Sequence, residues 1–167
     1  MRSDMVPGAT FPDYELSDHT AKHRKLSELQ GQDPMVIVLS RGAFCPKDRR
    51  QAEGLLQLHR EMEVGYCRLV TISTDNITQT NENRSGIGAH RPFLSDPRRV
   101  VQKDLDIAEY TDPVNNPMIP PVIVLEPGLV IHLQWLLVLR TAHHRRPPPG
   151  PARRQQEMPA GLAHRNA

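Results

Sequence analysis

Cys45 is the residue whose type and setting most clearly suggest chemistry. It follows an apolar run at residues 35–39 and an Arg41-Gly42 turn, and it precedes Pro46. The unbroken run of β-formers predicts a strand buried on both faces. Proline is tolerated in the first turn of a helix, because its missing N–H would have no partner there. The pattern therefore places a thiol at a helix N-terminus, where free N–H groups and the helix dipole favour a thiolate.

Each residue near the thiol also has an interpretation without chemistry, and the sequence leaves both open. Cys45 is a reactive thiol or a small core residue, since unpaired cysteines are often simply buried. Arg41 is a cation that stabilises a thiolate, or it is a surface charge. Asp48 lies one helical turn after Cys45. It is a solvated residue or a group that tunes or deprotonates the thiol, although so close a carboxylate disfavours a thiolate.

The second cysteine, Cys67, lies in a predicted strand at residues 66–73 and is either a packing residue or a resolving partner for Cys45. Two cysteines do not make a disulfide framework in a chain of this size, which fits a reducing compartment. The N-terminus lacks an apolar signal core, and the most apolar stretch, residues 129–139, is about half the ~20 residues that span a bilayer. We therefore expect a soluble cytoplasmic protein without a membrane partner.

Length and charge point to one domain followed by a tail. A chain of 167 residues suits a single domain. Residues 1–135 carry 15 Lys and Arg against 18 Asp and Glu, whereas residues 136–167 carry six Arg and one acid. We predict that this Pro- and Arg-rich tail is disordered, and the body gives no reason to expect nucleic acid as a partner. The histidines lack the spacing of metal ligands and no Gly-rich phosphate loop is present, so we expect neither metal nor cofactor.

The periodicity predicts alternating strands and helices. Besides the strands at residues 35–39 and 66–73, short strands are expected at 11–16 and 92–96, and a hairpin at 122–125 and 129–133. Residues 18–25 are polar and turn-like. Helices are expected at 26–29, 46–64, 76–85 and 97–110, the second with Leu55, Leu58 and Met62 on its apolar face. This order predicts an α/β domain with three layers and a mixed sheet.

Two motifs match those of a known family. Its Arg-Gly-x-x-Cys-Pro-x-Cys-Arg segment is matched by Arg41-Gly42-Ala43-Phe44-Cys45-Pro46-Lys47-Asp48-Arg49. Its Phe-x-Leu-Ser-Asp segment is similar to Phe93-Leu94-Ser95-Asp96-Pro97. Over about residues 6–133 the chain resembles the peroxiredoxin-like redoxins, the alkyl hydroperoxide reductase and thiol-specific antioxidant family. The resemblance implies a thioredoxin-like three-layer fold over residues 1–135, with a central mixed sheet flanked by helices.

The resemblance also implies a function. It implies a thiol-dependent oxidoreductase with an antioxidant role, in which Cys45 reduces a peroxide or disulfide substrate. An external thiol would restore the cysteine, and a homodimer is compatible with the family. Pro120 stands where thioredoxin-fold proteins carry a cis-proline facing the reactive cysteine; the alternative is an ordinary loop proline.

Three departures from the family pattern bear on activity. Asp48 replaces the second cysteine of a Cys-x-x-Cys pair, which excludes local dithiol chemistry. Gly42 stands where peroxiredoxins carry Thr or Ser to position the peroxide. The second arginine of the peroxidase site has no clear counterpart, and Arg91 is the candidate. The departures at Asp48 and Gly42 favour an alternative function, a catalytically degenerate thioredoxin-fold binding module.

The family resemblance ends near residue 133, where a redoxin domain would continue into a C-terminal helix. If bases two and three of each codon are read with base one of the next, a turn, a capping Thr-x-x-Asp and an amphipathic helix become possible. In that reading Trp135-Leu136 must give Gly, and Met158-Pro159 must give Cys. We hypothesise that residues from about 133 onward are a frameshift product. Such a chain would lack its last helix and lose stability, to the point of not folding.

Overall fold

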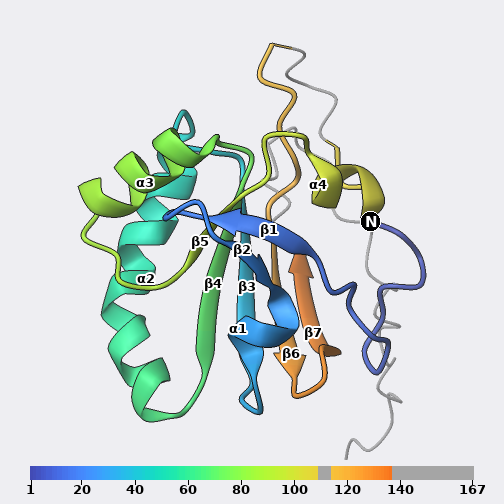
Figure 1. Ribbon diagram of the computed structural model, residues 1–167. Helices are drawn as coiled ribbons and strands as arrows, with labels where there is room; N and C mark the ends of the chain where they lie inside the picture. The colour runs from blue at the N-terminus through green and yellow to red at the C-terminus, as the bar shows by residue number, and fades with distance from the viewer. Residues whose placement is uncertain (109–113, 137–167) are drawn as a thin grey trace, which may run out of the picture.

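The computed structural model describes residues 1–108 and 114–136. Within these ranges the strands form one seven-stranded sheet in the order β2-β1-β5-β4-β3-β6-β7 (Figure 1). The predicted tail at residues 136–167 lies outside the described residues except for its first residue, which ends β7.

The centre of the sheet consists of the apolar runs seen in the sequence. Strands β3 (Met35–Ser40) and β4 (Arg68–Ser73) are parallel neighbours. Strand β6 (Pro121–Glu126) pairs antiparallel with β3 and forms a hairpin with β7 (Val130–Leu136). The sheet is therefore mixed, and the predicted C-terminal hairpin is confirmed.

The outer strands differ from the prediction. Strand β5 (Phe93–Ser95) lies within the short strand predicted at residues 92–96, and it pairs in parallel with β4. Strand β1 (Glu15–Asp18) lies further along the chain than expected, and β2 (His23–Lys25) forms where a turn was predicted. β2 is polar because it is an edge strand: its main chain pairs with β1, and its side chains need not enter the core.

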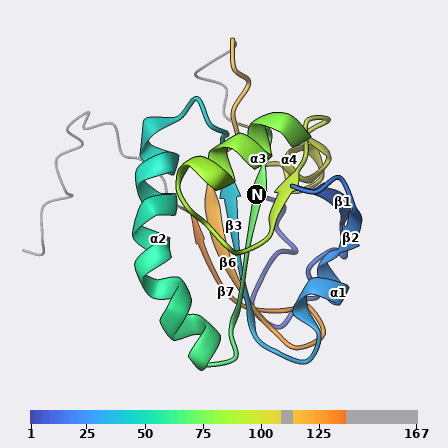
Figure 2. The same ribbon diagram turned by 60° about the vertical axis from the view of Figure 1, so that its left-hand side comes forward.

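Helices lie on both faces of the sheet, which confirms the thioredoxin-like three-layer fold. Helices α2 (Pro46–Val64) and α3 (Ile77–Gly86) lie on one side, and α1 (Leu26–Gln30) and α4 (Val100–Asp104) lie on the other (Figures 1 and 2).

Helix α4 is much shorter than the helix predicted at residues 97–110. The Asp96 carboxylate accepts hydrogen bonds from the N–H groups of Val100 and Val101, at 2.8 and 2.9 Å, and fixes where the helix begins. Arg99 and Asp106, at φ 55° and 51°, adopt the left-handed conformation on either side of the helix. The apolar periodicity continues through this interruption, so it overstates the length of the helix.

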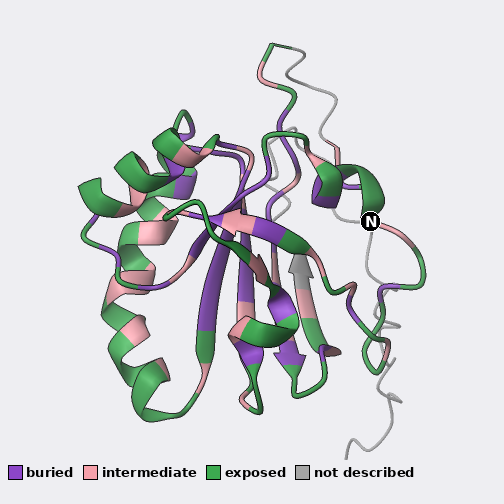
Figure 3. Ribbon diagram, viewed as in Figure 1, coloured by how far each residue is buried: buried purple, intermediate pink, exposed green. Residues whose placement is uncertain are grey.

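The two faces of the sheet are packed unequally. The larger core lies on the side of α1 and α4 and includes Met35, Ile37 and Ile72. On the other side, Ala52 and Leu56 of α2 contact a smaller cluster with Phe93. Leu58 was expected on the buried face of α2 but is 51% exposed. Much of α2 is exposed or half-buried, as Figure 3 shows.

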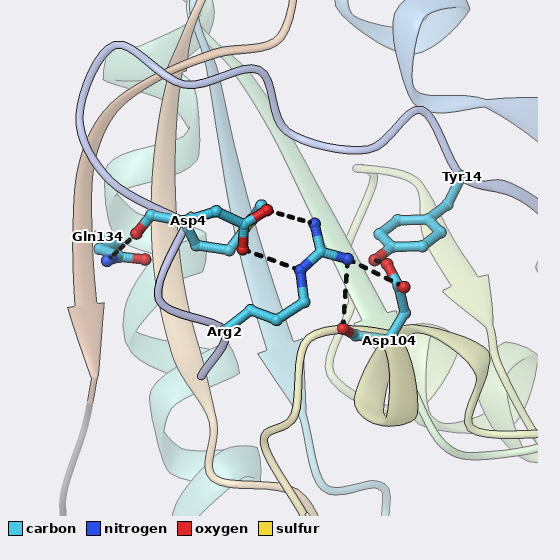
Figure 4. A network of polar contacts seen from close by, with 6 residues as sticks. Arg2, Asp4, Tyr14, Asp104 and Gln134 are labelled. Carbon is cyan, nitrogen blue, oxygen red and sulfur yellow. Dashed lines mark hydrogen bonds and ion pairs between the residues drawn. The ribbon is translucent and has the colours of Figure 1, made fainter.

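The N-terminal segment is tied to elements far along the chain (Figure 4). Arg2 donates to the carboxylate of Asp104 on α4 at 3.0 Å, and the hydroxyl of Tyr14 donates to the same carboxylate at 2.5 Å. Burial and the Asp104 charge raise the pKa of Tyr14. On β7, the side-chain amide of Gln134 donates to the carbonyl oxygen of Met5. These contacts hold the segment against the sheet edge.

Candidate active site

Cys45 lies in the connection from β3 to α2, at the edge of the sheet where β3 and β4 end. The N–H of Cys45 donates to the Gly42 carbonyl oxygen at 3.1 Å and closes a tight turn. Cys45 is the N-cap of α2 and Pro46 begins the helix, as the sequence predicts. Cys45 is only 7% exposed, so the site admits small reactants at most without rearrangement.

Asp48 and Arg41 form a buried ion pair beside the cysteine. One carboxylate oxygen of Asp48, Oδ1, accepts from Nη2 and Nε of Arg41 at 2.7 and 3.1 Å. The other, Oδ2, accepts from the main-chain N–H of Arg41 at 2.5 Å and from the Ser40 hydroxyl at 3.3 Å. Both residues are buried. Asp48 is therefore not a solvated helix residue, and Arg41 is not a surface charge.

The Cys45 thiol contacts this ion pair through its acid. Sγ donates to Oδ1 of Asp48 at 3.3 Å. The Cys45 side chain makes no capping hydrogen bond to the helix N–H groups, the interaction that the sequence favours for a thiolate. Two unit charges at that separation repel each other by roughly 5 kcal/mol at an effective dielectric constant of about 20. The observed geometry is that of a thiol that donates to a carboxylate already paired with Arg41.

The turn before Cys45 requires glycine. Gly42 has φ 115°, and a Cβ there would lie 2.6 Å from Oδ1 of Asp75. The same carboxylate holds the turn, since its Oδ2 accepts from the Ala43 N–H at 2.8 Å and from the Ser73 hydroxyl at 2.8 Å. A Thr or Ser at position 42, as in peroxiredoxins, does not fit this backbone.

Asp75 is the site residue that sequence reasoning missed. The N-cap of α3 is the next residue, Asn76, whose side chain accepts from the Gln79 N–H. A usable signal was present: Thr74-Asp75 directly follows β4, and the ends of neighbouring parallel strands meet at one sheet edge. Polar residues after β4 were therefore bound to lie near those after β3.

Pro120 lies near the site, but not as a cis-proline. No peptide bond in the described ranges is cis, so the bond before Pro120 is trans and the predicted cis form is wrong. The trans form is the more stable by about 0.5–1 kcal/mol for a residue before proline. Pro121 also restricts Pro120 to extended conformations, which lead directly into β6. Val38 pairs with Val122 in the sheet, so the same register places Pro120 opposite Ser40.

Cys67 is remote from Cys45. Both cysteines are free, and they flank the two ends of α2, a helix of 19 residues. At 1.5 Å per residue the helix is about 28 Å long, whereas a disulfide requires Cα atoms within ~7 Å. Cys67 is half-buried just before β4, where burial and the nearby Asp33 charge raise its pKa. It is therefore not a resolving partner for Cys45 within one folded chain.

Arg91 packs between α2 and the sheet instead of facing the thiol. Its Nε donates to the Thr71 hydroxyl at 3.2 Å and its Nη2 to the Ala52 carbonyl at 3.4 Å, and its guanidinium lies 5.0 Å from the centre of the Phe93 ring. Burial and the charge of Arg84 lower its pKa to about 10. These contacts give Arg91 a packing role and not that of the second peroxidase arginine.

A pocket of about 630 Å³ lies away from the thiol site. It is lined by residues such as His59, Cys67 and Arg91, and Cys45 does not line it. In the described parts of the chain, no three or more His, Cys, Asp or Glu residues are grouped to hold a metal ion. No helix among them combines the length and the apolarity needed to cross a bilayer.

The fold and the site together define a thioredoxin-like protein with a cysteine at the start of the helix that follows a central parallel strand. The model of the AhpC/TSA family matches residues 7–133. The chain belongs to this family, the peroxiredoxins. No curated protein matches the sequence.

Solved structures of peroxiredoxins are similar to the chain in fold. The peroxidoxin BcpB from Mycobacterium tuberculosis has a TM-score of 0.72 and 23% identity, over 79% of this chain and 86% of that chain. The bacterioferritin comigratory protein of Xanthomonas campestris has a TM-score of 0.67 and 17% identity, over 81% of this chain and 87% of that chain. The yeast mitochondrial 1-Cys peroxiredoxin has a TM-score of 0.67 and 13% identity, over 79% of this chain and 67% of that chain. At these identities the likeness concerns the fold alone.

Proposed function

We propose that this chain is a thiol peroxidase that uses one cysteine. In the first step, Sγ of Cys45 attacks the peroxide O–O bond, an S–O bond forms and the O–O bond breaks. The thiol proton ends on the leaving oxygen, so that thiol and hydroperoxide become sulfenic acid and alcohol. An external thiol then forms a mixed disulfide with release of water, and a second thiol restores Cys45.

One observation carries this proposal: Cys45 is the N-cap of α2 beside a buried ion pair, while Cys67 lies beyond the far end of that helix. A nucleophile without a local partner needs an external reductant. The Xanthomonas campestris relative is described by its alkyl peroxide reduction activity, and the yeast relative by thiol resolution through glutathione and thioredoxin systems. We carry both ideas to this chain as a peroxide substrate and a thiol reductant.

A second candidate function is a thioredoxin-fold binding module without catalysis. The turn geometry favours it, because Gly42 has no hydroxyl with which to position a peroxide and Asp75 leaves no room for one. In this alternative, Cys45 is a packing residue whose replacement changes stability but not chemistry.

Peroxide consumption separates the two functions. Purified protein is mixed with hydrogen peroxide and dithiothreitol, and the loss of peroxide is followed for wild type, Cys45→Ser and Cys67→Ser. The peroxidase proposal expects loss of the protein-dependent rate in Cys45→Ser and an unchanged rate in Cys67→Ser. Equal rates for wild type and Cys45→Ser would contradict it and favour the binding module.

The proposal includes the setting of the reaction. The protein acts in the cytoplasm, because an external thiol reductant is abundant in a reducing compartment. It acts alone or as a homodimer, on a small peroxide, without nucleic acid or membrane as a partner.

A further inference from the structure

We infer that Asp48 restrains Cys45, because its carboxylate holds the thiol in the protonated form and keeps the Arg41 guanidinium from it. The inference deepens the proposed function and rests on it only in naming Cys45 as the nucleophile. It assigns to position 48 a restraining role in place of the partner thiol that the family motif has there.

The first argument is the set of donors around the carboxylate. Oδ1 of Asp48 accepts from Sγ at 3.3 Å while it also accepts from Nε and Nη2 of Arg41. Oδ2 accepts from the Arg41 N–H and the Ser40 hydroxyl. Because all of these neighbours donate, Asp48 is the ionised acceptor and Cys45 supplies the proton. Loss of that proton would leave two anions in contact.

The second argument is that, within the described residues, neither group expected to stabilise a thiolate donates a hydrogen bond to Sγ. The Arg41 guanidinium is directed at Oδ1 of Asp48, and Cys45 makes no side-chain capping bond to α2. The Arg41 guanidinium and the Cys45 thiol thus both donate hydrogen bonds to Asp48. Neutralising Asp48 would remove the repulsion between its carboxylate and a Cys45 thiolate.

Asp48 is unsuited to the opposite role, that of a base that activates the thiol. A carboxylic acid is a stronger acid than a thiol by several orders of magnitude, so proton transfer to Asp48 is uphill. Both carboxylate oxygens of Asp48 also already accept hydrogen bonds from Arg41. The two roles predict opposite effects of Asp48→Asn on the reactivity of Cys45: a restraining Asp48 predicts an increase, and an activating base predicts a decrease.

The rate at which iodoacetamide alkylates Cys45 at pH 7 shows which effect occurs. The thiolate displaces iodide, an S–C bond forms, and the thiol proton goes to the buffer, so the rate follows the thiolate fraction. All variants of the full chain carry Cys67→Ser, so that Cys45 is the reacting thiol. We expect Asp48→Asn to react at least about tenfold faster than the parent and Asp48→Glu, which keeps the charge, to stay slow. Glu53→Gln, which removes an exposed acid from the same helix, should change the rate less than twofold.

An unchanged or lower rate in folded Asp48→Asn would overturn the inference. A second measurement does not depend on that variant folding. The infrared spectrum of the Cys67→Ser protein at neutral pH should show an S–H stretching band that disappears when Cys45 is alkylated. Absence of the band would also overturn the inference. Neither measurement uses peroxide, so an inactive wild type would contradict the peroxidase proposal without deciding this one.

Discussion

A single side chain, that of Asp48, distinguishes this chain from proteins that carry a Cys-x-x-Cys pair at this position. It stands where the related motif has its second cysteine, and it is the third residue after Cys45 at the start of α2. Side chains three residues apart in a helix are neighbours, about 5–6 Å between Cβ atoms. The backbone therefore retains the geometry of a Cys-x-x-Cys pair, although the second thiol is absent.

We predict that Asp48→Cys forms a disulfide with Cys45 in air. Titration of the unreduced variant with a thiol reagent should then detect Cys67 alone, and all three cysteines should react after reduction. Lys47→Cys is the control: side chains two positions apart in a helix do not face each other, so its three thiols should stay free. Three free thiols in Asp48→Cys after oxidation would show that the first turn of α2 is not arranged as described.

The position of the Cys45 thiol was predictable from the sequence, whereas its surroundings were not. An apolar run followed by Cys45-Pro46 defines a strand and a helix start by local rules alone. The burial of Arg41 and Asp48 depends on how the start of α2 lies against the end of β3, and the contact of Asp75 depends on the neighbouring strand. Such contacts join residues that no local pattern relates.

At the scale of elements, the central strands, the C-terminal hairpin and α2 were predictable, whereas β2 and the length of α4 were not. β3 carries a strong apolar signal because it is a central strand, and Pro46 marks the start of α2. β2 forms through main-chain pairing at the sheet edge, and its polar side chains give no strand pattern in the sequence. α4 ends where Asp106 turns left-handed, although the apolar spacing continues.

Two glycines next to or within α2 should respond oppositely to alanine. Gly54 lies in the helix and is exposed, and a Cβ added there would have no neighbouring atom within 4 Å. Gly54→Ala should therefore stabilise the protein by about 1 kcal/mol, or roughly 2–4 °C in Tm for a domain of this size. Gly42→Ala should destabilise it by about 1–3 kcal/mol, because of its positive φ and the Asp75 carboxylate. Thermal melts of both variants measure this; a lower Tm for Gly54→Ala would contradict the described helix.

On the scale of the whole molecule, one part of the sheet lacks a covering helix among the described residues. Val38 and Phe93 lie under α2 and α3 and are buried. On the same face further along, Val36 and Val124 are half-buried and Leu133 is 45% exposed. The register of β3, β6 and β7 places these three side by side. We call them the uncovered strip.

An apolar dye should report on the uncovered strip. We predict that the folded protein enhances the fluorescence of anilinonaphthalene sulfonate and that Leu133→Lys lowers the signal. Val64→Lys, which replaces an exposed valine at the end of α2, should leave it unchanged. A protein that does not bind the dye would mean that the strip is covered in solution.

The hypothesis of a frameshift concerns the same region, since the resemblance ends near residue 133, within β7. The described structure does not bear on it, and the nucleotide sequence does. Read in the shifted frame from Leu133 onward, the codons should encode a capping Thr-x-x-Asp and an amphipathic helix without early stop codons. Codons that cannot give this reading would contradict the hypothesis.

The central claim is that Cys45 is a nucleophile toward peroxide, and trapping its first product tests it most directly. The protein is treated with one equivalent of hydrogen peroxide in the presence of dimedone, which captures sulfenic acids, and the modified peptide is identified by mass spectrometry. The account predicts a dimedone adduct on Cys45, the N-cap of α2, and none on Cys67, which lies beyond the far end of that helix. No adduct on Cys45, or equal labelling of the two cysteines, would contradict it.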